Sequence, residues 1–181
     1  MRQTRTTEMI LSAMFAALSA VLSQISIPIG LVPINLTHVS VFLAAGLLGA
    51  RYGAFSQIAF VLMGAFGIPV FSGFAGGAGI IAGPTGGFII GYICCAFVSG
   101  LIINRFGKSM KVLIPAMYAG WFASYIPGVL WFMHVTGVKL AAALPFCVLP
   151  FLPGDAAKTV LSAALVNRLQ VPVQNVLRRP T

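Results

Sequence analysis

The chain has 181 residues, of which 59% are hydrophobic and only 7% are charged. Soluble domains carry about 25% charged residues, so the composition indicates an integral membrane protein. The net charge of +9 does not indicate nucleic acid binding, because the basic residues stand singly between apolar runs. They do not form a basic face with aromatic residues interspersed. We expect a single integral membrane domain over residues 1–181, surrounded by lipid, without nucleic acid or metal.

Six apolar segments, each predicted to be a transmembrane helix, follow one another along the chain. The first has the length needed to cross the roughly 30 Å of hydrocarbon, whereas the second and third are short for full spans. The fold class predicted is therefore an all-α bundle of six transmembrane helices. The segments cover residues 9–27, 37–50, 54–68, 88–104, 112–133 and a last one ending near Leu169.

The basic residues predict the orientation of these six helices, because cytoplasmic loops of membrane proteins are enriched in Lys and Arg. Nine bases fall on the side that holds both chain ends, and only Lys139 falls on the other. This places the N and C termini in the cytoplasm and requires an even number of spans. The nine bases are Arg2, Arg5, Arg51, Arg105, Lys108, Lys111, Arg168, Arg178 and Arg179.

Small residues repeat at four-residue spacing in the first segment, where Ala13 precedes Ala17 and Ala16 precedes Ala20. Such a smooth face lets another helix approach closely. The pattern predicts either internal packing or a docking face for another membrane protein.

The connections on the outer side, residues 28–36, 69–87 and 134–153, are rich in Pro or Gly and almost free of charge. The middle one is too apolar for a solvated loop, so we expect it to fold over the outer mouth of the bundle. Its glycines Gly73, Gly76 and Gly77 predict a flexible lid or a backbone that approaches a ligand, with close packing as the alternative. Pro84 begins the fourth segment, and the N–H groups near Thr85 and Gly86 are candidates to hold a carboxylate.

Asp155 and Lys158 are the strongest functional signal, because they place an acid and a base at membrane depth. Pro153 and Gly154 break the preceding segment, which predicts Asp155 as the cap of a new helix with Lys158 on the same face. Ionisable residues within the membrane face the bundle interior and often mark a substrate path. The alternative is a purely structural salt bridge.

Other polar and aromatic residues give weaker signals. His38 and His134 lie at segment ends and are interpreted as interfacial polar residues. The aromatic residues of the fifth segment, among them Trp121 and Tyr125, fit either membrane-interface anchors or a pocket lining.

Three stretches together resemble the BioY proteins, the biotin-binding substrate subunits of energy-coupling-factor (ECF) transporters. They are "ISIPIGLVPINL" from Ile25, "GIPVFSGFAGGAGIIAGPTGGFIIGY" from Gly67 and "PFLPGDAAK" from Pro150. The resemblance covers nearly the whole chain. It implies high-affinity biotin binding and uptake across a bacterial cytoplasmic membrane, with biotin as the transported substrate and no cofactor.

The resemblance also implies roles for particular residues. Asp155 and Lys158 match the acid and base that contribute to biotin binding in the family, and a ureido ring offers donors and an acceptor that suit them. The alanine face of the first segment matches the family's docking face for a transmembrane coupling subunit, which two ATPase subunits drive. Where family members often have V-P-I-T-L-Q-T, this chain has V-P-I-N-L-T-H, and Asn35 is predicted as the replacement hydrogen-bonding group.

Other functions are left open at lower rank. The same fold could carry another vitamin or a biotin precursor. An intramembrane enzyme would need a nucleophile and base or a metal set, and no G-x-S-x-G or H-E-x-x-H sequence is present. A channel would need polar side chains along several segments, which the second to fifth segments almost lack.

Overall fold

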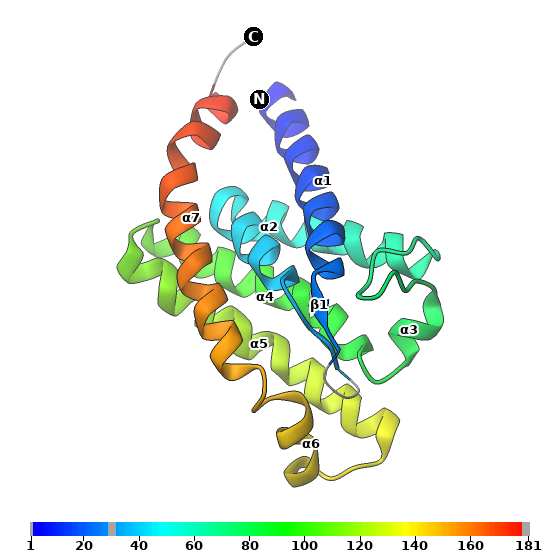
Figure 1. The fold of residues 1–181 in the computed structure, drawn as a ribbon. Helices are drawn as coiled ribbons and strands as arrows, with labels where there is room; N and C mark the ends of the chain where they lie inside the picture. The colour runs from blue at the N-terminus through cyan, green and yellow to red at the C-terminus, as the bar shows by residue number, and fades with distance from the viewer. Residues whose placement is uncertain (1, 29–31, 179–181) are drawn as a thin grey trace.

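A computed structural model describes residues 2–28 and 32–178 and shows a bundle of long helices (Figure 1). Residues 29–31 of the first predicted outer connection and the predicted cytoplasmic base Arg179 lie outside the described residues. The elements in chain order are α1 (Arg2–Gln24), β1 (Ser26–Ile27), β2 (Ile34–Asn35), α2 (Thr37–Ala65), α3 (Ala78–Ala82), α4 (Gly86–Phe106), α5 (Met110–Thr136), α6 (Leu140–Cys147) and α7 (Leu152–Arg178).

Four of the described helices, α1, α2, α4 and α5, are long and apolar enough to cross a membrane, and α6 with α7 forms a fifth candidate bent by 53°. Helix α2 is two helices joined at Gly49, whose backbone has φ 81° and ψ −174°. A side chain is strained at such a φ, whereas glycine adopts it readily. With the two halves of α2 counted separately, each of the six predicted segments has its helix, which confirms the all-α prediction.

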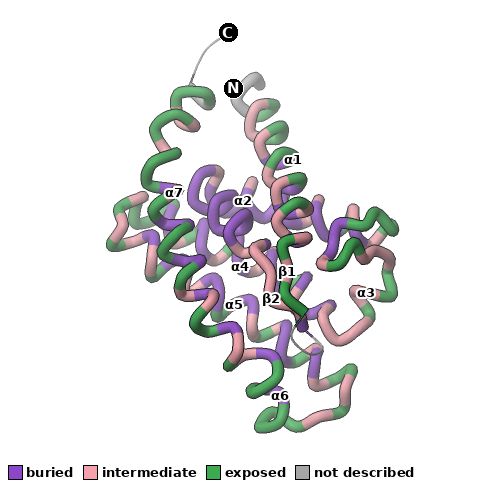
Figure 2. The backbone as a smooth tube through the Cα atoms, in the orientation of Figure 1, coloured by how far each residue is buried: buried purple, intermediate pink, exposed green. Residues whose placement is uncertain are grey.

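The packing places α2 at the centre of the bundle. Helix α4 packs against both α2 and α5, while α1 and α7 cover α2 from other sides. The purple tube in Figure 2 shows this burial of α2, in contrast to the largely exposed outer faces of α1 and α7. The apolar core includes Phe42, Phe60, Met117 and Trp121.

The connections that the sequence predicts on the outer side contain structure of their own. Ser26 and Ile27 pair in antiparallel register with Asn35 and Ile34, which closes a small hairpin between α1 and α2. The short helices α3 and α6 lie within the predicted second and third connections. The start of α1 and the end of α7 lie at one end of the molecule and α6 at the other (Figure 1).

Candidate functional site

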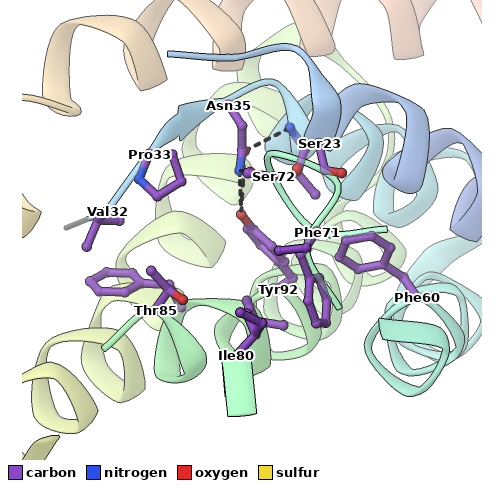
Figure 3. Close-up of a pocket in the computed structure, with 14 residues that line it drawn as sticks. Ser23, Val32, Pro33, Asn35, Phe60, Phe71, Ser72, Ile80, Thr85 and Tyr92 are labelled. Carbon is purple, nitrogen blue, oxygen red and sulfur yellow. Dashed lines mark hydrogen bonds between the residues drawn. The ribbon is translucent and has the colours of Figure 1, made fainter. Parts of the chain in front are cut away.

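A cavity of about 170 Å³ lies where the hairpin, the loop after α2 and the start of α4 meet (Figure 3). Its walls are mostly apolar, with Phe60 from α2, Phe71 from the loop and Ile89 from α4 among them. Ser23, Ser72 and Thr85 add hydroxyl-bearing side chains to its lining. None of its described lining residues is charged. A cavity with apolar walls and a few polar groups is typical of a small-molecule site.

Asn35 is the polar centre of this cavity. Its amide Nδ2 donates to Ser72 Oγ at 2.8 Å and lies 3.5 Å from Tyr92 Oη, and a dashed line in Figure 3 marks the contact with Tyr92. Its Oδ1 accepts the backbone N–H of Thr37 at 3.1 Å, which fixes the turn that leads into α2. One side chain therefore joins the hairpin, the loop after α2 and helix α4.

Asp155 and Lys158 form a buried ion pair on the inner face of α7. Lys158 Nζ lies 2.5 Å from Asp155 Oδ1, and the two residues are 7% and 2% exposed, respectively. The same Nζ donates to the backbone carbonyl of Asn35 at 2.9 Å. The predicted placement of both residues on one helix face is confirmed, and Lys158 connects α7 to the residue at the centre of the cavity.

Two aromatic side chains of α5 hold the carboxylate of Asp155. Trp121 Nε1 donates to Asp155 Oδ2 at 2.7 Å, and Tyr125 Oη donates to the same oxygen at 3.0 Å. Hydrogen bonds to a charged acceptor are about twice as strong as neutral ones. Tyr125 therefore lines the site, and the buried Trp121 supports it through Asp155, so neither residue anchors the chain at the membrane interface, a choice that the sequence left open.

Asp155 is not the cap of its helix, so that prediction was wrong. Helix α7 already begins at Leu152, and the N–H of Asp155 donates to the carbonyl of Phe151 at 2.8 Å. Pro153 does not break the helix, because a proline is tolerated in a first turn whose N–H groups have no helical partner. The Asp155 carboxylate is thereby free to face α5 and the interior.

A second, smaller chamber of about 30 Å³ lies between the ion pair and the cavity. Asp155, Lys158 and His38 line it, and it shares Asn35 and Tyr92 with the larger cavity. Such a volume holds two or three water-sized groups. The two chambers thus form one site with a charged end and a neutral end.

Three buried polar atoms around these chambers make no hydrogen bond with any described residue. They are Thr37 Oγ1, His38 Nε2 and Asp155 Oδ1, of which the last contacts only the Lys158 ammonium as an ion pair. His38 packs edge-on against Tyr92, with ring centroids 5.0 Å apart, so its interpretation as an interfacial residue was wrong. Because buried polar groups are normally paired, these atoms indicate a site that a polar ligand completes.

The glycines of the predicted lid lie beside the cavity but are not among its lining residues. Gly73 and Gly77 have positive φ and shape the loop, and the N–H of Gly77 donates to Gly64 O at 2.7 Å. Gly76 lies against the carbonyl of Ile68. Their neighbours Phe71, Ser72 and Ala75 line the cavity instead.

At the start of α4, Thr85 lines the cavity as its position in the sequence suggested. The N–H of Gly86, however, donates to the carbonyl of Gly83 at 3.1 Å. This amide is therefore not available for a carboxylate, and the Thr85 hydroxyl is the group that faces the cavity at this point.

The four alanines of α1 do not share one exposed face. Ala13 and Ala17 are exposed, whereas Ala16 is 2% exposed and packs in the core and Ala20 is half-buried. Ala13 and Ala17 are therefore the two of the four most accessible for an external helix contact, and Ala16 serves the internal packing of the chain.

Comparison with known proteins gives consistent matches over almost the whole chain. The family model described as "BioY family" matches residues 1–175. The chain is 38% identical over 164 residues to the biotin transporter BioY of Thermotoga maritima, which covers 90% of this chain and 95% of that protein. It is 39% identical over 163 residues to a probable biotin transporter BioY of Pyrococcus horikoshii, with coverage of 90% and 96%.

A solved structure shows the same fold. The crystal structure of the S-component for biotin from an ECF-type ABC transporter superposes with a TM-score of 0.85 at 30% identity, over 94% of each chain. The fold is thus that of a multi-pass membrane S-component. The match of nearly every residue to one family model, together with these relatives, shows that the chain belongs to the BioY family.

Proposed function

We propose that this chain binds biotin with high affinity and serves as the substrate-capture subunit of an ECF-type transporter. The observation that carries the proposal is the composite site, in which a buried acid–base pair ends an otherwise uncharged cavity. The relatives named as biotin transporters and the solved S-component for biotin support it. The whole chain acts as a single membrane domain in this proposal.

The charged end of the site suits the ureido ring of biotin. A ureido group has two N–H donors and one carbonyl acceptor, which complement Asp155 Oδ1, the ammonium of Lys158 and His38 Nε2. Trp121 and Tyr125 hold the carboxylate in place, so little ordering is needed when the ligand binds. Asp155 and Lys158 are therefore proposed as direct ligand contacts.

The neutral end of the site suits the rest of the molecule. The apolar rings and chain of biotin fit the walls formed by Phe60, Phe71 and Ile89, and Ser72 and Thr85 offer hydroxyl groups to the far end. Asn35 holds the loop after α2 in place from within the site. Gly73 and Gly77, with positive φ, and Gly76, packed against the Ile68 carbonyl, serve the same binding by shaping that loop beside the cavity.

Transport needs partners in this proposal. The exposed Ala13 and Ala17 of α1 form a smooth face for a transmembrane coupling subunit, which two ATPase subunits drive. Both termini lie in the cytoplasm and the protein lies in the cytoplasmic membrane of a bacterium. The start of α1 and the end of α7 lie at the same end of the molecule (Figure 1), and this arrangement and the nine-to-one distribution of basic residues support the orientation.

Calorimetric titration of the purified, detergent-solubilised chain tests the proposal. Biotin should bind tightly, and dethiobiotin, riboflavin and thiamine should bind more weakly or not at all. Binding of another vitamin in preference to biotin would retain the fold and replace the substrate. No binding of any of the four by a folded sample would contradict the proposal.

A further inference from the structure

A groove of about 530 Å³ lies on the outside of the bundle, between α1 and the second half of α2. Met9, Ala13, Phe55 and Ala59 give it an apolar floor, and Met9 and Phe55 are 64% and 46% exposed. The groove shares no lining residue with the chambers of the biotin site. It is therefore a separate feature of the surface.

Two arginines, Arg5 from α1 and Arg51 from α2, line the same groove, and both are exposed. Neither forms an ion pair with any of the described residues. The Arg51 guanidinium lies 5.9 Å from the ring centroid of Tyr52 and 5.7 Å from that of Phe55, which holds it beside the apolar floor. Glu8, the only acid of the chain besides Asp155, does not line the groove.

The Ser12 hydroxyl in the groove is already satisfied. Ser12 Oγ is 2.8 Å from the Glu8 carbonyl and 3.1 Å from the Tyr52 carbonyl, so the hydroxyl links α1 to α2. The groove thus offers two unpaired cations and apolar surface. A ligand that complements it has an anionic head and a hydrocarbon tail.

We propose that this groove binds one anionic phospholipid of the cytoplasmic leaflet. The phosphate lies between the guanidinium groups of Arg5 and Arg51, which match phosphate oxygens in pairs. In the chain without its coupling subunit, one acyl chain lies along Met9, Phe55 and Ala59. Both arginines belong to the predicted cytoplasmic side, where anionic lipids attract basic residues next to the membrane.

Native mass spectrometry of the purified full chain with added phosphatidylglycerol or phosphatidylcholine tests this site. We expect one phosphatidylglycerol to be retained at least tenfold more strongly than phosphatidylcholine. The variants Arg5→Gln and Arg51→Gln should abolish this preference. Arg105→Gln is the matched control and should retain it, because Arg105 is also exposed and lies 5.9 Å from an aromatic ring, yet does not line the groove.

A further variant and a further ligand distinguish the contribution of the lipid head group from that of the acyl chain. Ala59→Leu fills the floor of the groove and should weaken retention of both lipids, while inorganic phosphate at the same concentration should not displace phosphatidylglycerol. The proposal fails if the two lipids bind equally to the parent, if Arg105→Gln loses the preference as Arg51→Gln does, or if phosphate alone displaces the lipid. If the two lipids bind equally and a coupling subunit displaces both, the groove belongs to the docking face of Ala13 and Ala17 instead.

Discussion

Removal of the Lys158 ammonium separates the structural role of the buried pair from its role in binding. In Lys158→Met, the Asp155 carboxylate loses its ion pair at 2.5 Å, and the Asn35 carbonyl loses its donor at 2.9 Å. Breaking a buried pair by removing one partner costs about 3–5 kcal/mol of stability. Biotin binding is affected separately. Loss of one charged hydrogen bond to the ligand lowers the binding free energy by about 1.5–3 kcal/mol, which raises Kd roughly 10- to 150-fold.

The double variant Asp155→Asn/Lys158→Met makes the distinction measurable. It removes both charges, so it should recover much of the lost stability, while biotin affinity should stay as low as in the single variant or fall further. Thermal unfolding and calorimetric titration in the same detergent measure the two quantities. Lys139→Met is the control, because Lys139 is exposed and should change neither. The reasoning is refuted if the double variant regains biotin affinity together with stability.

Three further predictions follow from contacts in the same bundle. Trp121→Phe should weaken biotin binding by roughly tenfold in a calorimetric titration, because it removes the indole that donates to Asp155 at 2.7 Å. Trp131→Phe is the control and should show no comparable loss, because the Trp131 indole donates to the Gly83 carbonyl at 3.0 Å instead. Gly49→Ala should lower the midpoint of thermal unfolding by an amount equivalent to about 1–3 kcal/mol, because the φ of 81° at this position suits only glycine. Gly79→Ala should leave that midpoint unchanged or raise it, because no atom lies within 4 Å of the added methyl group. In a competition titration, the Kd of biotin methyl ester should lie within about tenfold of the Kd of biotin, because no described residue that lines the larger cavity is charged. A loss of affinity of several hundredfold would place the biotin carboxylate at Lys158 instead.

The sequence predicts those parts of the structure that depend on local pattern. Six apolar segments predict the helices because each must satisfy its own backbone groups within the membrane. The pairing of Asp155 with Lys158 follows from their i,i+3 spacing, and the structure confirms it. Their use in binding a ligand stays a prediction.

Features that depend on distant contacts are not visible in the sequence. The two donors of Asp155 come from α5, about 30 residues away, and no local pattern selects Trp121 over Trp131 for this role. Lys158 reaches Asn35 across 123 positions. The burial of Ala16 depends on which face of α1 is turned toward α2. The sequence does not determine this face, because the four-residue alanine spacing is the same on two faces of the helix.

A structure of the purified chain with bound biotin would show how the ligand lies in the two chambers. We expect the ureido ring in the smaller chamber, with a nitrogen within hydrogen-bonding distance of Asp155 Oδ1 and the carbonyl within reach of Lys158 Nζ. The carboxylate end should lie in the larger cavity near Ser72 and Thr85. Biotin bound in the reverse direction, or outside these two chambers, would contradict this expectation.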